Sequence, residues 1–313
     1  MHGDLKRRMH PVLLHLDDAL IGQAALTSRI GASLGQALDC RDLGPAIRLW
    51  SRTGPLQALE ARLEQALPGD GYPVLAFSGS GDFHHVTPSL LRHACQAAGN
   101  PAVTVVHFDN HPDWVRFENG LHCGSWVGAA ARIPCVEKVI TVGVCSPDID
   151  APATDAADAA LIHDGLLEMY AYRAPRGGAL DLFGRRWPTI ETLGKSAFAS
   201  LLYERIRTDA VYVTIDKDVL KPSDAATNWD QGELGLNYLK TLIGVVASGR
   251  RLIGADVTGD WSRPRYGGKG FDGLMKRGEA LLDQPWASPS PGAKRLNEAV
   301  NIALLDCFQR VIQ

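Results

Sequence analysis

The chain has 313 residues, of which 45% are hydrophobic and 21% are charged, and its formal net charge is −3. This is an ordinary globular composition, and the length is sufficient for one large α/β domain with a sizeable core. The charge balance argues against nucleic acid or a membrane surface as the main partner. Neither a signal-peptide pattern nor an apolar run long enough to span a membrane is present, so we expect a cytoplasmic protein.

The six cysteines are scattered along the chain without a C-x-x-C pair, and several lie within apolar stretches. They are Cys40, Cys95, Cys123, Cys135, Cys145 and Cys307. This usage predicts reduced thiols in the core rather than a disulfide framework or a zinc site.

Compact apolar runs alternate with segments of helical periodicity. Strands are expected at Pro11–Leu16, Tyr72–Phe77, Val103–Phe108, Lys138–Val144, Ala210–Ile215 and Leu252–Ala255. Helices are expected at Leu56–Leu67, Leu90–Ala98, Ser125–Ala131, Phe198–Arg207, Leu236–Ser248 and Leu296–Val311. The alternation predicts an α/β fold with a mainly parallel sheet covered by helices on both faces. We expect a single domain over residues 1–313, in which residues 171–188 and 262–292 are the least regular parts.

The stretch most informative about function is Val105–Asp113, where an apolar strand runs into Asp109, His111 and Asp113. Side chains at steps of two point to the same side of an extended backbone. Open α/β sheets bind their ligands at the carboxyl ends of their strands. Carboxylate and imidazole together suit a divalent cation. A hydrogen-bonded polar turn without any metal is the alternative interpretation of this motif.

Other strand ends supply residues of the same type. Asp216 and Asp218 follow the strand at Ala210–Ile215, and His84 or His85 lies in a Gly-rich turn after the strand at Tyr72–Phe77. One cation rarely needs four aspartates and two histidines, and the carboxylates would repel one another strongly. Two divalent cations that share carboxylates account for the whole set.

Several motifs resemble those of the arginase/agmatinase (ureohydrolase) superfamily, in the same order. The segment from Gly81 to Thr87 resembles the family's Gly-Gly-Asp-His-Ser, and Phe108–Asp113 is similar to its Asp-Ala-His-x-Asp. Thr214–Leu220 resembles Ser-x-Asp-x-Asp-x-x-Asp-Pro, and Asn119–Gly124 resembles Gly-Asn-x-His-Gly. Thr227 with Gly232–Leu236 is similar to Thr-Gly-Thr followed by Gly-Gly-Leu.

The resemblance implies a three-layer α/β/α fold and two Mn²⁺ per chain, with nickel, cobalt or iron as alternative metals. His84, Asp109, Asp113 and Asp216 would hold one ion, and Asp109, His111, Asp216 and Asp218 the other. A metal-bridging hydroxide would attack a guanidino carbon, releasing urea and an amine. Asp113 would take the proton of the hydroxide and His122 would protonate the leaving nitrogen. Family members are often homo-oligomers, so an oligomer is expected.

The expected substrate contacts depart from the family pattern. Gly259 occupies the position of the family's guanidinium-binding glutamate, and Asp260, one residue later, is the candidate replacement. Arg116, Asn119, Asp148 and Thr227 are further candidate substrate contacts, although each also suits a loop-stabilising role. The departure favours an N-modified guanidine or an arginyl peptide over free arginine. The alternatives are a single-zinc deacetylase-like enzyme, a formimino or amide hydrolase, and a non-catalytic ligand-binding protein.

Overall fold

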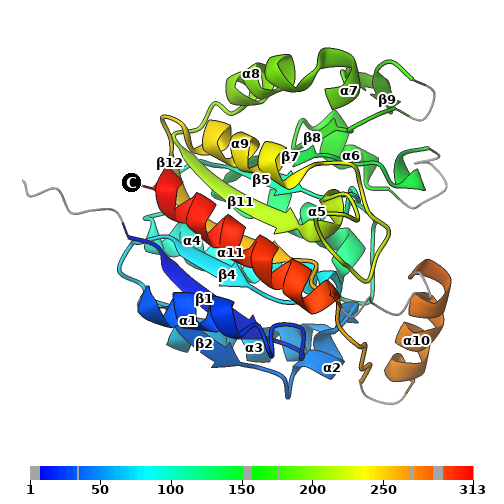
Figure 1. Cartoon of the computed structure of the whole chain (residues 1–313). Coiled ribbons are helices and arrows are strands. Elements are labelled where there is room, and N and C mark those ends of the chain that lie inside the picture. Colours follow the sequence, from blue (N-terminus) through cyan, green and yellow to red (C-terminus); the bar gives the residue numbers. More distant parts are fainter. Residues whose placement is uncertain are drawn as a thin grey trace, which may run out of the picture.

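A computed structural model describes residues 8–33, 35–150, 157–174, 177–267, 271–284 and 292–312. Its centre is an eight-stranded sheet in the order β2-β1-β4-β12-β11-β5-β7-β8, and every neighbouring pair in it is parallel (Figure 1). The strands are β1 (His10–His15), β2 (Gln36–Asp39), β4 (Val74–Phe77), β5 (Val103–Phe108), β7 (Val136–Val142), β8 (Leu167–Tyr170), β11 (Ala210–Asp216) and β12 (Arg251–Thr258).

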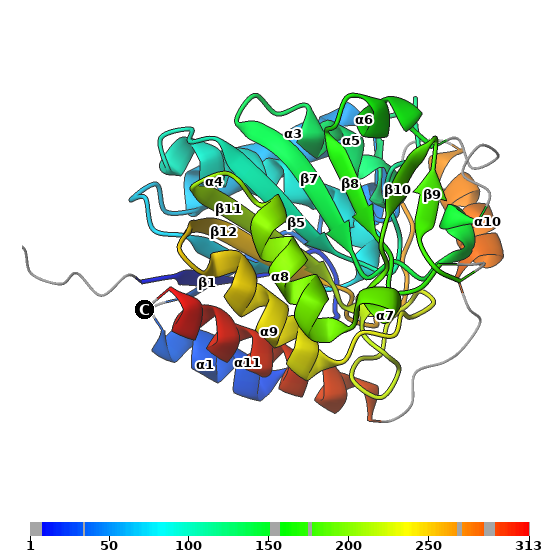
Figure 2. The ribbon, with the colours of Figure 1, turned by 90° about the horizontal axis from the view of Figure 1, so that it is seen from above.

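Helices cover both faces of this sheet (Figure 2). One face carries α1 (Ala24–Ala32), α8 (Lys195–Arg205), α9 (Leu236–Ala247) and α11 (Ala293–Val311). The other carries α3 (Thr53–Ala66), α4 (Thr87–Ala97), α5 (Trp126–Ala131) and α6 (Ala159–His163). The predicted three-layer α/β/α architecture is therefore confirmed.

The central strands are buried on both faces, which is why they read as apolar runs in the sequence. Within β5, Val105 packs into one core cluster, whereas Val106 and Phe108 pack into the other, on the opposite face. This alternation follows from the two-residue period of a strand. The polar residues of the candidate site follow directly after the carboxyl end of β5.

Small elements complete the chain. They are α2 (Gly44–Ile47), β3 (Trp50–Ser51), β6 (Leu121–His122), β9 (Leu180–Leu182), β10 (Arg185–Trp187), α7 (Ile190–Leu193), α10 (Asp272–Asp283) and 3₁₀ turns at Gly81–Val86, Cys123–Ser125, Pro147–Ile149 and Lys217–Val219. The β9–β10 hairpin and α10 occupy the two segments that the sequence left without regular structure. No described helix is both long and apolar enough to pass through a bilayer.

The prediction of six reduced thiols is wrong for one pair, because Cys95 and Cys135 form a disulfide. Cys95 lies in α4 and Cys135 precedes β7, and their Cα atoms are 6.7 Å apart, within the range that a disulfide can bridge. Cys135 lies beside the start of β5, because Val103 N donates a hydrogen bond to Cys135 O. Cys40, Cys123, Cys145 and Cys307 are free thiols.

Candidate metal centre

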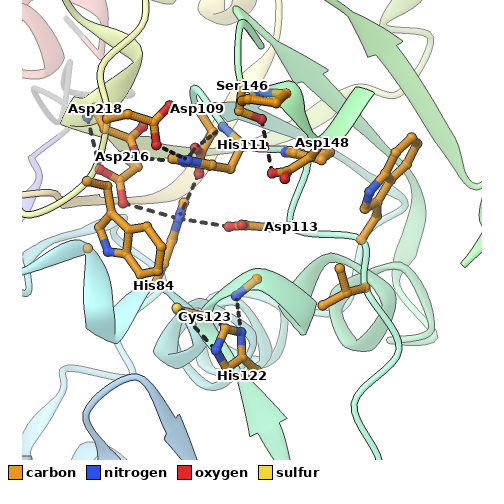
Figure 3. Close-up of a pocket in the computed structure, with 18 residues that line it drawn as sticks. His84, Asp109, His111, Asp113, His122, Cys123, Ser146, Asp148, Asp216 and Asp218 are labelled. Atoms are coloured by element: carbon orange, nitrogen blue, oxygen red, sulfur yellow. Dashed lines mark hydrogen bonds and ion pairs between the residues drawn. The ribbon is translucent and has the colours of Figure 1, made fainter. Parts of the chain in front are cut away.

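A cavity of about 550 Å³ lies at the carboxyl edge of the sheet. All six residues expected to bind metal line it, and they come from the turn after β4, the end of β5 and the end of β11 (Figure 3). They are His84, Asp109, His111, Asp113, Asp216 and Asp218.

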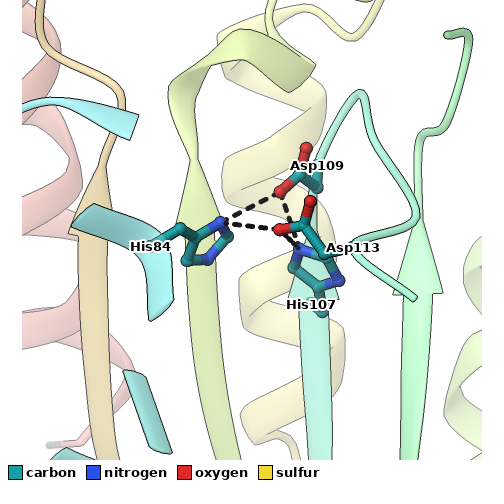
Figure 4. Close-up of side chains that lie close together, drawn as sticks. All are labelled: His84, His107, Asp109 and Asp113. Atoms are coloured by element: carbon teal, nitrogen blue, oxygen red, sulfur yellow. Dashed lines mark hydrogen bonds and ion pairs between the residues drawn. The ribbon is translucent and has the colours of Figure 1, made fainter. Parts of the chain in front are cut away.

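Two compact groups of potential ligand atoms share Asp109. The first contains His84, His107, Asp109 and Asp113 (Figure 4). His84 Nδ1 lies 3.0 Å from Asp109 Oδ2 and 3.3 Å from Asp113 Oδ2. His107 Nε2 lies 2.8 Å from Asp109 Oδ2. His107 was not predicted as part of the site, although it stands two residues before Asp109 on the same side of β5.

The second group contains Asp109, His111 and Asp218. His111 Nδ1 lies 2.9 Å from Asp218 Oδ2, and His111 Nε2 lies 2.9 Å from Asp230 Oδ1. Asp216 belongs to neither compact group, but its Oδ2 is 3.7 Å from His84 Nδ1. The six expected ligands thus converge on one site, with Asp109 at its centre.

The hydrogen bonds of His84 leave one of its ring nitrogens available as a ligand. Thr214 Oγ1 donates its only proton to Asp256 Oδ1 at 2.8 Å, so it accepts the Nε2 proton of His84, also at 2.8 Å. The opposite nitrogen, Nδ1, is buried and makes no well-aligned hydrogen bond. This orphaned atom, facing carboxylates, is the arrangement that a metal-binding histidine requires.

The neighbouring His85 is arranged differently. It is fully buried, neither of its ring nitrogens has a hydrogen-bond partner among the described residues, and it does not line the cavity. Burial lowers its pKa well below the ordinary value, so the ring is neutral. Of the two histidines, His84 is the one that faces the carboxylates.

Three of the four buried carboxylates of the site have raised pKa values. Burial, together with the charge of Asp109, raises the pKa of Asp113 and of Asp216 to about 6. The same two causes raise the pKa of Asp218 well above its ordinary value. Divalent cations would neutralise this cluster, and mixed carboxylate and imidazole donors suit such ions. The residues present therefore fit the expected metal in both charge and donor type.

We expect metal-free protein to lose stability between pH 5 and pH 7. Folded Asp113 and Asp216 hold a proton up to about pH 6, whereas the ordinary aspartate pKa is 3.8. As the pH rises, the folded state must give up protons that the unfolded state has already lost. Unfolding therefore becomes easier, by on the order of 2 kcal/mol over this range. Denaturant titrations of chelator-treated protein at both pH values measure this, and added Mn²⁺ should remove the trend. A rise in stability with pH after chelation would contradict it.

His122 lines the cavity on the far side of Asp113 from Asp109 and His111 (Figure 3). Its Nδ1 accepts the backbone N–H of Gly124 at 2.8 Å, and its Nε2 lies 2.7 Å from Glu279 Oε1. Neither ring nitrogen approaches a member of the ligand set within ion-pair distance. The structure therefore separates His122 from the candidate ligands while keeping it at the same cavity.

Comparisons with solved structures show what this architecture resembles. The arginase of Bacillus caldovelox aligns over 97% of this chain and 98% of its own, with a TM-score of 0.60 and 16% identity. A hypothetical agmatinase of Burkholderia thailandensis gives the same score and identity, covering 97% of this chain and 86% of its own. The proclavaminate amidino hydrolase of Streptomyces clavuligerus aligns over 98% of this chain and 92% of its own length, with a TM-score of 0.58 and 15% identity.

The chain has the arginase/agmatinase fold. No protein-family model matches the sequence. An uncharacterised protein of Thermotoga maritima is 28% identical over 186 residues, a match that spans 59% of this chain and 58% of that relative. The likeness that supports the arginase/agmatinase fold is therefore structural, at low sequence identity.

Within this arginase/agmatinase fold, only Asp148 among the expected substrate contacts lines the cavity. Its Oδ2 accepts a hydrogen bond from Ser146 Oγ at 3.0 Å. Arg116 and Asn119 are exposed and lie outside the lining, and Arg116 donates to the carbonyl of Ala157. Thr227 also lies outside it and donates to the carbonyl of Trp229 at 2.8 Å. Arg116 and Thr227 thus make contacts of the kind expected of loop-stabilising residues, and neither they nor Asn119 line the cavity.

The expectation that Asp260 replaces the family's glutamate is not supported by its position. Asp260 is buried outside the cavity lining, and its Oδ2 lies 2.8 Å from Lys217 Nζ. The chain turns at Gly259, where φ is +92°, and a Cβ at that position would collide with Asp216 Oδ1. The backbone thus leaves no room for a side chain at position 259 and directs Asp260 away from the cavity.

The loop after β11 supplies two lining residues that the sequence did not reveal, Trp229 and Asp230. The Trp229 ring lies 5.6 Å from that of His111, and Asp230 binds His111 Nε2 and the Asn110 side chain. Asp216 and Asp218 could be found in the sequence because they follow an apolar strand. Trp229 and Asp230 lie in an irregular loop, which has no such pattern.

Proposed function

We propose that the protein is a divalent-metal-dependent hydrolase that cleaves a guanidino-type C–N bond, releasing urea and an amine. The observation that carries this proposal is the convergence of six imidazole and carboxylate side chains on one cavity, where the Nδ1 of His84 has no hydrogen-bond partner and faces three of the carboxylates. The arginase/agmatinase fold supports the reaction class, and in this chain the cluster lies at the carboxyl edge of the sheet, where α/β folds bind their ligands.

Two Mn²⁺ ions are the proposed cofactor, with nickel, cobalt or iron as alternatives. In this proposal Asp109 and Asp216 would serve both ions, His84 and Asp113 would complete one site, and His111 and Asp218 the other. Bound divalent cations would polarise the guanidino group and lower the pKa of a water molecule.

We assign proton transfer and substrate attraction to side chains at the cavity. Asp113, with a pKa of about 6, is ionised at neutral pH and can accept a proton there. The Trp126 indole N–H, 2.6 Å from Asp113 Oδ2, fixes the orientation of that carboxylate. His122 is the proposed proton donor to the leaving nitrogen. Asp148 and Asp230 add carboxylates to the lining and would attract a cationic substrate.

The size of the cavity bears on the substrate class. Its volume of about 550 Å³ lies within the range of roughly 300–1,000 Å³ typical of sites for drug-sized ligands. A guanidino group on a larger body, such as an N-modified arginine or an arginyl peptide, would fill it better than a minimal guanidine. We place these two substrate classes ahead of free arginine because Gly259 stands at the position of the family's guanidinium-binding glutamate.

The test combines metal analysis by mass spectrometry with a screen for urea release. The screen covers arginine, agmatine, guanidino acids, N-hydroxyarginine and arginyl peptides. About two manganese ions per chain with urea release from one of these compounds is the expected result. Two metals without urea would move the proposal to formimino or amide substrates. One zinc ion with deacetylase activity, or no metal and no turnover, would overturn it.

A further inference from the structure

The two histidines among the candidate ligands, His84 and His111, are supported in different ways. The Nε2 proton of His84 is donated to the neutral hydroxyl of Thr214 at 2.8 Å. His111 Nε2 faces a carboxylate instead, because it lies 2.9 Å from Asp230 Oδ1. The two histidines therefore differ in the charge of the group that lies behind them.

The opposite ring nitrogen of His111 faces other candidate ligands (Figure 3). Its Nδ1 lies 2.9 Å from Asp218 Oδ2 and 3.5 Å from Asp109 Oδ1. Histidine binds a metal as the neutral ring, so a cation held by these three residues takes the place of any proton on Nδ1. The one proton of the ring is then on Nε2, where the Asp230 carboxylate accepts it.

Asp230 is itself held in place by a hydrogen-bonded neighbour. Asn110 Nδ2 donates to Asp230 Oδ2 at 2.9 Å and to the backbone oxygen of Asp230 at 3.1 Å. Asn110 stands between Asp109 and His111 in the chain, so the strand-end motif itself fixes the carboxylate that supports His111. The Asp230 side chain lines the cavity and is 52% exposed, so it can be replaced without opening a hole in the core.

We propose that Asp230 is the positioning residue for His111 and that it strengthens one of the two proposed metal sites through the Nε2 proton. The inference rests on the proposed function, in which His111 and Asp218 complete one site. A carboxylate that accepts the second N–H of a metal-binding histidine fixes the tautomer and orientation of the ring and makes it a stronger donor. Asp230 bonds to no other candidate ligand among the described residues. Its loss should therefore weaken the site of His111 and spare the site that His84 completes.

The test measures Mn²⁺ binding to the full-length protein by equilibrium dialysis with metal analysis. Asp230→Ala should weaken one of the two sites by about 10-fold and leave the other within about 2-fold of the wild type. Asp230→Asn keeps an oxygen that can accept the Nε2 proton, so it should recover part of the affinity. The control is Glu233→Gln, which removes the same charge from the same loop, where Glu233 is exposed and pairs with Arg173. It should bind Mn²⁺ as the wild type does.

A second measurement separates positioning of His111 from a general change in the loop. Nitrogen-15 NMR of histidine-labelled protein loaded with diamagnetic Zn²⁺ should show a His111 Nε2 proton that exchanges slowly with water in the wild type and in Glu233→Gln. Asp230→Ala should lose this slow exchange, while circular dichroism shows an unchanged fold.

The outcomes distinguish this inference from the proposed function. Unchanged affinity at both sites, equal weakening of both sites, or slow exchange that persists in Asp230→Ala would overturn the inference alone. Wild-type protein that binds no Mn²⁺ would overturn the proposed function as well. A loss of affinity confined to one site supports the inference even if no compound in the screen releases urea.

Discussion

Asp109→Asn should reduce bound metal from about two ions per chain to fewer than one. Asp109 is the only residue that belongs to both compact ligand groups among the described residues, and both of its carboxylate oxygens face the site. Hydrolytic activity should fall at least about 100-fold, because even the loss of a supporting contact behind a ligand costs 10- to 100-fold. Mass spectrometry and the rate of urea release measure the two effects.

The matched control is Asp209→Asn, which removes the same charge from an exposed position just before β11, at the opposite edge of the sheet. It should retain full metal content and activity. Circular dichroism of both variants separates metal loss from unfolding. A folded Asp109→Asn protein that retains two metals would contradict the central place given to this carboxylate.

Asp260→Ala should destabilise the protein by about 3–5 kcal/mol, because it leaves a buried lysine without its counter-ion. Lys217 and Asp260 are both almost completely buried, and the side chains of Gln23 and Asn301 also donate to the Asp260 carboxylate. Burial lowers the pKa of Lys217, and the Asp260 charge opposes that shift. Denaturant-induced unfolding measures the loss in free energy.

A double variant provides the control for this interpretation. Replacing both charges, Lys217→Met with Asp260→Leu, should recover much of the lost stability, because no unpaired charge then remains buried. If Asp260 instead binds the guanidinium group of a substrate, the opposite result is expected for Asp260→Ala. In that case Asp260→Ala would raise KM strongly while the free energy of unfolding stayed near that of the wild type.

Local patterns in the sequence were sufficient for the strand ends that form the site. In β5 and β11, apolar residues lead directly into Asp109 and Asp216, so the periodicity and the change in polarity both mark where ligands emerge. Because parallel strands run in the same direction, these ends lie at one edge of the sheet. The resemblance of the motifs added the expectations of a binuclear metal centre and of a proton-donor role for His122, a residue that lines the cavity.

Features that depend on contacts distant in sequence were not predictable in this way. Helix α10 was missed because it lies within residues 262–292, a segment rich in glycine, proline and charged residues. The Cys95–Cys135 disulfide spans 40 residues and matches no short motif. The position of Asp260 outside the cavity lining could not be predicted, because it depends on the turn at Gly259, and a positive φ at one glycine is not visible in the sequence.

The close approach of Gly259 to Asp216 also restricts how this scaffold can be redesigned. Gly81 approaches the other carboxylate oxygen of Asp216, so a side chain at either glycine would push a candidate ligand out of place. A glutamate placed at position 259 would therefore be expected to reduce metal binding. Variants at Trp229 offer another way to change the cavity wall, because this residue lines it and is not a glycine pressed against Asp216.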